Sequence, residues 1–206
     1  MIAIVDYNAG NLTSVKLALD YLGAPAEITQ DPERILAAER VIFPGVGSAG
    51  AAMRNLLALG LAEVLRQVVQ RGTPFLGICL GAQIIFESSE EADEAPLLGL
   101  LAGTVKRFRP ANRSDKVPQI GWNGVRFVRP HPLLQGIESG SEFYFVHSYY
   151  PAPPERDLVL GETEYADVRF ASIVARANLA ATQFHPEKSG RLGLQLLKNF
   201  TRWQPA

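Results

Sequence analysis

The first half of the chain alternates short apolar runs with segments in which apolar residues recur at helical spacing. Runs typical of buried strands occupy residues 2–6, 40–43 and 74–78. Helical patterns cover residues 12–22, 49–58 and 61–71, and another begins at Cys79. Such an alternation of strands and helices predicts a parallel sheet with helices on both faces.

The second half is richer in short strand patterns separated by polar or proline-rich stretches, and these strands are expected to be antiparallel or mixed. They lie near residues 103–108, 124–128, 143–149, 157–162, 170–175 and 179–184. A final helix carries an apolar stripe from Leu192 to Trp203. The predicted fold is therefore α/β, a mostly parallel open sheet with helices on both faces plus additional antiparallel strands in the C-terminal half, in one domain over residues 1–206.

Composition excludes several classes of protein. The 206 residues are 47% hydrophobic and 20% charged, and the net charge of −1 argues against a protein that binds nucleic acid through its charge. The single cysteine excludes an intrachain disulfide and a thiolate zinc site. No metal or cofactor is expected. The N-terminus lacks a basic region, and no apolar stretch reaches the roughly 18 residues of a membrane span, so a cytoplasmic location is expected.

The first candidate site surrounds Cys79. The sequence PFLGICLGAQ runs from an apolar strand through Gly-x-Cys-x-Gly into a helix, which is the cysteine form of a nucleophile elbow. Gly77 and Gly81 would leave room for crowded backbone, and the helix N-terminus would favour the thiolate. The backbone N–H of Leu80 would then face a developing oxyanion. A buried cysteine that packs as a small hydrophobe is the alternative.

The second candidate site is the segment LAATQFHPEK. A strand is expected to carry His185 and Glu187, so that both side chains lie on one face and the carboxylate orients the imidazole. Pro186 should end this strand. The other two histidines favour structural roles: His147 lies in an aromatic strand that could border a pocket, and His131 lies in a proline-bracketed loop where it is expected to be solvated.

A glycine-rich segment follows the strand at 40–43. Residues 45–50 read GVGSAG, which matches the dinucleotide-binding pattern literally but lacks the required acidic residue after a second strand. The favoured interpretation is a loop whose backbone N–H groups approach a reacting oxygen closely.

Together, GICLGAQ, FHPE and PGVG resemble the class I, triad-type glutamine amidotransferases over essentially the whole chain. The segments DYNAGNLTSV, VPQIGWN and FYFVHSYY further resemble the glutaminase subunits of imidazole glycerol phosphate synthases. This resemblance implies hydrolysis of glutamine to glutamate and ammonia, with Cys79 as nucleophile, His185 as general base and Glu187 orienting the imidazole. It implies oxyanion donors from Leu80 and from the Gly45–Val46–Gly47 backbone. The implied substrate-binding residues are Gln83, Glu91, His147, Ser148 and Tyr149.

The resemblance also implies a (β/α)8-barrel cyclase subunit as partner, which uses the ammonia to make imidazole glycerol phosphate and an aminoimidazole carboxamide ribonucleotide. The residues that match its interface are Asn8, Asn11, Trp122, Asn123, Tyr144 and Lys188. The GWN motif is interpreted as a loop that exposes Trp122. We further hypothesise that the oxyanion donor on the Gly45–Gly47 loop is misaligned until the cyclase binds its own substrate. The basic stretch from Lys106 to Lys116, which includes Arg113, is interpreted as a solvated loop.

Three alternatives remain at this point. The chain could serve another synthase, such as that of anthranilate or pyridoxal phosphate. It could be a free-standing γ-glutamyl hydrolase with the same triad. It could also be a scaffold that has lost the reaction, although the intact cysteine, histidine and glutamate argue against this.

Overall fold

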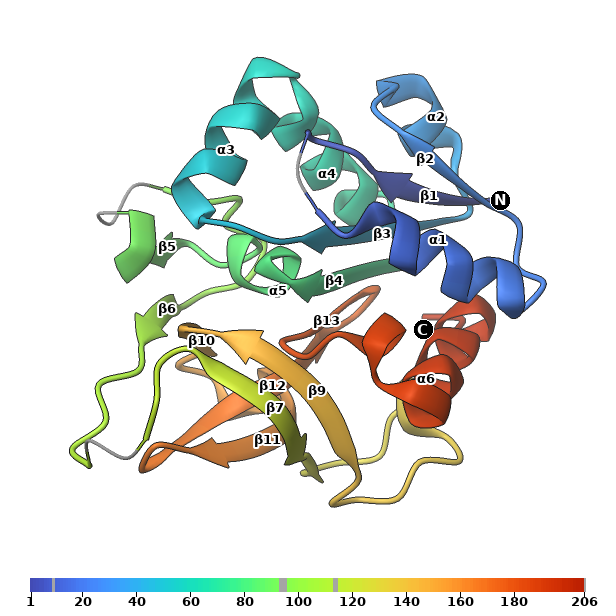
Figure 1. Ribbon diagram of the computed structural model, residues 1–206. Helices are drawn as coiled ribbons and strands as arrows, with labels where there is room; N and C mark the ends of the chain where they lie inside the picture. The colour runs from blue at the N-terminus through green and yellow to red at the C-terminus, as the bar shows by residue number, and fades with distance from the viewer. Residues whose placement is uncertain (9, 93–95, 113–114, 206) are drawn as a thin grey trace.

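The computed structural model describes residues 1–8, 10–92, 96–112 and 115–205. Its centre is an eight-stranded sheet in the order β2-β1-β3-β4-β13-β12-β11-β8, which crosses the molecule in Figure 1. The strands of this sheet are β1 Ile2–Val5, β2 Ala26–Thr29, β3 Arg40–Gly45, β4 Phe75–Cys79, β8 Arg126–Phe127, β11 Val159–Tyr165, β12 Val168–Arg176 and β13 Leu179–Thr182.

Strands β2, β1, β3, β4 and β13 are parallel, whereas β12, β11 and β8 extend the sheet with antiparallel pairs. This arrangement confirms the predicted fold class. The helices are α1 Leu12–Tyr21, α2 Pro32–Ala37, α3 Ala49–Ala58, α4 Leu61–Gln70, α5 Leu80–Ile84 and α6 Gly190–Arg202. Short 3-10 turns occur at η1 Glu90–Ala92, η2 Pro132–Leu134, η3 Arg156–Leu158 and η4 Pro186–Lys188.

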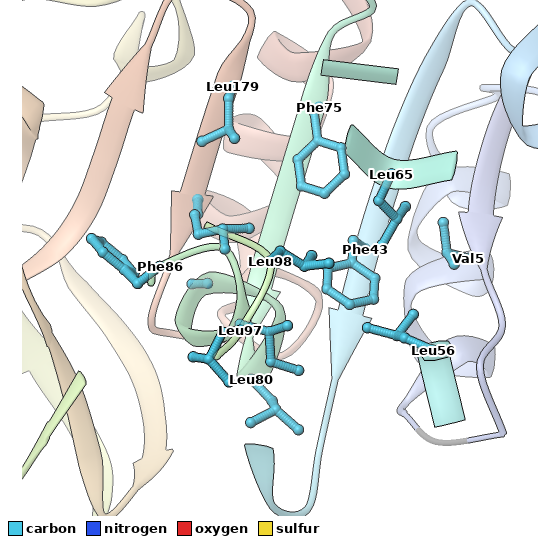
Figure 2. Packing of buried hydrophobic residues seen from close by; sticks show 14 of the residues in the cluster. Val5, Phe43, Leu56, Leu65, Phe75, Leu80, Phe86, Leu97, Leu98 and Leu179 are labelled. Carbon is cyan, nitrogen blue, oxygen red and sulfur yellow. The ribbon is translucent and has the colours of Figure 1, made fainter. Parts of the chain in front are cut away.

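The alternation of side chains along each parallel strand produces two hydrophobic layers. In β3, Val41 and Phe43 belong to the layer covered by α2, α3, α4 and α5, while Ile42 belongs to the layer covered by α1 and α6. Figure 2 shows the first layer, in which Phe43 and Phe75 lie between the sheet and Leu65 of α4. Helices on both faces therefore bury β1, β3, β4 and β13, as their continuous apolar runs require.

Two smaller sheets lie beside the central one. Strands β10 Tyr149–Ala152, β6 Thr104–Arg107 and β5 Ser88–Ser89 form one, and β7 Gln119–Gly124 and β9 Glu142–His147 form the other. The pairing of β7 with β9 corrects one prediction, because the GWN motif lies in a strand and not in a loop. The pattern was hard to identify because β7 exposes its apolar side chains, Ile120 at 64% and Trp122 at 51%.

Most of the predicted elements are confirmed within a residue or two, including α1, α3, α4 and the strands around Ile42 and Phe75. No prediction covered β2 and α2. Strand β2 is an edge strand with little burial, so its hydrophobic pattern is weak. Helix α2 starts from a recognisable cap, in which the Asp31 carboxylate accepts a hydrogen bond from the backbone N–H of Glu33 and Pro32 is the first helical residue.

The register of the parallel strands positions the site. Gly45 pairs with Cys79 across β3 and β4, and Thr182 pairs with Ile78 across β13 and β4. The carboxyl ends of three neighbouring strands therefore meet at one edge, where sites form in open α/β sheets. In the described part of the chain, no helix has both the length and the hydropathy needed to span a membrane.

Candidate active site

Cys79 occupies a strained turn between β4 and α5. Its backbone has φ 54° and ψ −108°, a conformation that non-glycine residues rarely adopt. The turn is so tight that a Cβ added at Gly77 would lie 2.9 Å from the carbonyl oxygen of Gly81. The predicted turn from strand to helix at Cys79 is confirmed, and both glycines are required by close backbone approach.

His185 and Glu187 are in contact, but not for the predicted reason. The His185 Nδ1 and Glu187 Oε1 atoms are 2.7 Å apart, and both side chains are almost completely buried. Strand β13 ends at Thr182, and Glu187 lies in the 3-10 turn η4, which begins directly after His185. The prediction that both residues share a strand face is therefore wrong. Pro186 is the first residue of η4, and the turn brings the carboxylate back to the imidazole.

A third side chain holds Glu187 in place. The Asn11 amide Nδ2 donates a 3.1 Å hydrogen bond to Glu187 Oε1, and the Ser14 hydroxyl donates a 2.7 Å bond to Asn11 Oδ1. Asn11 was predicted to face a partner. Its side chain contacts the carboxylate that contacts His185, so it positions Glu187 from the residue before α1.

The environment of His185 favours its charged form. Burial alone would lower the pKa of the imidazole, but hydrogen bonding to Cys79 and Glu187, together with their negative charges, outweighs burial and raises the pKa to about 10. Nε2 of His185 is buried, and apart from Cys79 no group in the described part of the chain is a hydrogen-bond partner for it. An imidazolium beside the sulfur favours the thiolate, which is the nucleophilic form of cysteine.

The triad opens into a cavity of about 280 Å³. Both Cys79 and His185 line it. The predicted oxyanion and substrate-binding residues that also line it are Val46, Gly47, Leu80, Gln83, Glu91, His147, Ser148 and Tyr149. Pro118 and Val146 complete the wall and were not predicted. Six separate segments of the chain therefore contribute to one enclosure.

The glycine-rich loop after β3 lies beside the nucleophile. Gly45 is paired with Cys79 in the sheet, Gly47 has φ 95°, and the Val46 side chain is 41% exposed. A Cβ at Gly45 would approach Leu80 Cβ to 2.9 Å and would overlap the hydroxyl of Tyr7. Tyr7 is completely buried, and its hydroxyl has no hydrogen-bond partner among the residues that the structure describes. Burial together with the charge of Cys79 raises the pKa of Tyr7. Sequence reasoning missed Tyr7.

Glu91 borders the other end of the cavity. Its Oε2 accepts a 2.7 Å hydrogen bond from the backbone N–H of Ala49 at the start of α3. Burial raises the pKa of Glu91, and the bond from Ala49 opposes that shift. A carboxylate at this position can bind the ammonium group of an amino-acid ligand.

His147 is held as a neutral ring. Its Nδ1 lies 2.7 Å from the carbonyl oxygen of Tyr149, which can only accept, so Nδ1 carries the proton. Burial lowers the pKa of His147 to about 4, the bond to Tyr149 opposes that shift, and the charge of His185 adds to it. His131, by contrast, is half-buried against Trp203 and accepts a hydrogen bond from the backbone of Leu133, so the expectation that it is solvated is wrong.

The residues predicted to face a partner lie mainly on three neighbouring elements. Trp122 and Tyr144 pair across β7 and β9, with ring centroids 6.0 Å apart. The Tyr144 carbonyl accepts a 2.9 Å hydrogen bond from the backbone N–H of His185, which ties this hairpin to the triad. Asn123 extends β7, and Lys188 is exposed at the end of η4.

Asn8 lies further away, after β1, and its side-chain oxygen accepts a hydrogen bond from Gln30. In the basic stretch, Arg109 forms an ion pair with Glu90, while Arg113 lies outside the described residues. Within residues 1–8, 10–92, 96–112 and 115–205, no group of three or more His, Cys, Asp or Glu side chains could hold a metal ion.

The fold and this constellation define the class of the protein: an α/β enzyme with a cysteine–histidine–glutamate triad. Comparison with known proteins agrees. The family model for class-I glutamine amidotransferases matches residues 3–203. A solved structure described as a glutamine amidotransferase superposes with a TM-score of 0.73 at 20% identity, covering 98% of both chains, and the PurLQS structure from Thermotoga maritima also reaches 0.73, at 18% identity, covering 98% of this chain and 97% of that one.

Relatives with much higher sequence identity show which branch of this family the chain belongs to. The chain is 55% identical over 199 residues to imidazole glycerol phosphate synthase subunit HisH of Moorella thermoacetica, covering 97% of this chain and 93% of that protein. It is 50% identical over 200 residues to the HisH subunit of Herpetosiphon aurantiacus, again covering 97% and 93%. The chain therefore belongs to the class-I glutamine amidotransferase family, and within it to the HisH subunits.

Proposed function

We propose that this chain hydrolyses L-glutamine to L-glutamate and ammonia and supplies the ammonia to a cyclase partner in histidine biosynthesis. The observation that carries the proposal is that Cys79 and His185 line one cavity and Glu187 contacts His185 from behind, in a chain that belongs with the HisH subunits. The chain would act as one glutaminase domain over residues 1–206, in the cytoplasm and without a cofactor.

In this reaction the Cys79 thiolate attacks the side-chain amide carbon of glutamine. His185, which holds the proton taken from the thiol, gives it to the leaving ammonia, and a glutamyl thioester remains on Cys79. His185 then removes a proton from water, which hydrolyses the thioester and releases glutamate. Glu187 keeps the imidazole in the required orientation and stabilises its positive charge.

The negative oxygen that develops during both attacks needs hydrogen-bond donors. The backbone N–H of Leu80 and a backbone N–H from Gly45–Val46–Gly47 would provide them, since both segments border the sulfur. The amino-acid end of glutamine would lie at the other end of the cavity. There we propose contacts with Gln83 and Glu91, and with backbone groups of His147, Ser148 and Tyr149.

The partner would be the (β/α)8-barrel cyclase subunit of imidazole glycerol phosphate synthase, in a heterodimer. Ile120 and Trp122 support this proposal, because two large apolar side chains on one strand are more than half exposed beside the triad. Asn123, Tyr144 and Lys188 would extend that surface, Asn11 would border it directly before α1, and Asn8 would contact the partner further away, after β1.

The test is glutamate release from glutamine by the full chain, alone and then with a histidine-pathway cyclase and its nucleotide substrate. We expect low turnover alone and strong activation in the complex, which would also support a loop that is misaligned without the partner. Equal turnover in both conditions would refute the coupled loop and favour an independent hydrolase. Failure of an electrophilic glutamine analogue to label Cys79 would refute glutaminase activity altogether.

A further inference from the structure

The side-chain amide of Gln183 lies against the sulfur of Cys79. Its Nε2 is 3.8 Å from Sγ, a distance at which the large sulfur atom still accepts a hydrogen bond, and the residue is 1% exposed. Gln183 directly follows β13, and the pairing of Thr182 with Ile78 places it level with Cys79. It is therefore a buried polar group aimed at the reacting atom.

The neighbours of Gln183 determine which end of its amide faces the sulfur. The carbonyl oxygen of Tyr149 can only accept, so Gln83 must present its NH2 group there, at 2.9 Å. The same Nε2 of Gln83 lies 3.0 Å from Oε1 of Gln183. Gln183 therefore presents its oxygen to Gln83, and its NH2 group must point at Cys79.

We propose that Gln183 is a catalytic residue that stabilises the Cys79 thiolate by donating an N–H to its sulfur. A hydrogen bond to an ionised acceptor is about twice as strong as one to a neutral group, so this donor favours the thiolate over the thiol. The sulfur also lies 3.9 Å from the Val146 carbonyl oxygen, which can only accept and so favours the thiol. Removing the amide would leave the sulfur with that acceptor and with His185.

Five titratable side chains border Cys79 or its cavity, and substitution of Gln183 alters none of them. His185 follows β13 and takes the thiol proton, His147 lies on β9, Tyr149 lies on β10, Tyr7 follows β1, and Glu91 lies in η1. A change in the pH dependence of the thiol that follows Gln183→Met, which introduces no charge, is therefore assigned to the lost N–H donor. The thiolate argument stands on these contacts, and only its catalytic consequence rests on the proposed glutamine hydrolysis.

The test is the rate of Cys79 alkylation by iodoacetamide as a function of pH, followed by the mass of the whole protein. Cys79 is the only cysteine, so the readout is unambiguous and needs no glutamine turnover. Gln183→Met removes the donor. Gln183→Glu keeps an acceptor for Gln83 but removes the permanent donor to sulfur. We expect the midpoint of the alkylation profile to rise by about one pH unit in both, a tenfold change in the thiol equilibrium.

Thr182→Val is the matched control. It removes a buried hydroxyl one residue earlier, which donates to the Phe184 carbonyl and does not touch the sulfur. The midpoint of its alkylation profile should equal that of the unaltered chain. An unchanged midpoint in folded Gln183→Met or Gln183→Glu would overturn the proposal. If neither variant folds, NMR of the unaltered chain decides. The chemical shift of the Gln183 side-chain amide must change with pH, with the same midpoint as the alkylation profile. A chemical shift that does not depend on pH overturns the proposal.

Discussion

The close contact between α5 and β3 allows a quantitative prediction at Gly81. A Cβ added at Gly81 would lie 1.9 Å from the backbone oxygen of Phe43. Real Cβ atoms essentially never come closer than 3.0 Å to another heavy atom, so the overlap is about 1 Å. That oxygen belongs to β3, which is held between β1 and β4 and cannot move away easily. In Gly81→Ala, the first turn of α5 must therefore move by about 1 Å.

Two consequences follow from this displacement. Overpacking of a core contact lowers the free energy of unfolding by about 1–3 kcal/mol. The same movement shifts Cys79 and the backbone N–H of Leu80 relative to His185, and a 1 Å misplacement of reacting groups reduces rates by about 100-fold. We expect Gly81→Ala to lose about 2 kcal/mol of stability in urea and about 100-fold in glutamine hydrolysis by the complex.

Gly50→Ala is the matched control, because a Cβ there would meet only the end of the Arg54 side chain at 3.5 Å. Gly50 lies in α3, where alanine is favoured over glycine by up to about 1 kcal/mol. This variant should keep full activity and unfold at the same or a higher urea concentration. The reasoning is refuted if Gly81→Ala matches Gly50→Ala in both stability and turnover.

Three further predictions follow from the site and its surroundings. Asn11→Ala removes the hydrogen bond to Glu187, so kcat for glutamine should fall about tenfold with KM nearly unchanged in steady-state assays; an unchanged kcat would show that Asn11 has no positioning role. Trp122→Ala should weaken cyclase binding by about 2 kcal/mol, roughly 30-fold in Kd by titration calorimetry, without changing the melting temperature; equal affinities would place the partner elsewhere. His147 binds a proton in the unfolded chain below about pH 6.5 but in the native chain only below about pH 4, so stability should fall as the pH is lowered between these values. Urea unfolding at pH 7 and pH 5 should show a loss of about 2 kcal/mol that is absent in His147→Phe, and identical pH dependence in both proteins would contradict this assignment.

Sequence reasoning succeeded where the determinant is local. The Gly-x-Cys-x-Gly segment contains its own structural requirements, since a strand, a crowded turn and a helix start must follow one another within a few residues. The alternation of apolar runs and helical patterns in residues 1–86 is equally local, and the parallel strands β1, β3 and β4 follow from it.

Sequence reasoning failed where the burial of a residue depends on segments that are distant in the chain. Strand β7 pairs with β9, some twenty residues away, and exposes Ile120 and Trp122, so nothing in its own pattern distinguishes it from a loop. His185 and Glu187 meet through a 3-10 turn and not through a shared strand face, because β13 already ends at Thr182 and η4 begins at Pro186. The contact between His185 and Glu187 was predicted correctly, but the backbone conformation that creates it was not.

The sequence by itself determined the class of protein, the nucleophile, and the pairing of a histidine with a carboxylate, because each of these is encoded by neighbouring residues. Only the tertiary structure decided what surrounds the sulfur. The order of strands in the sheet brings Gly45, Cys79 and Gln183 to one edge. There the Tyr149 carbonyl fixes the amide of Gln83, and the Gln83 amide orients that of Gln183 toward the sulfur. Such an arrangement depends on the packing of segments roughly a hundred residues apart, which no local pattern encodes.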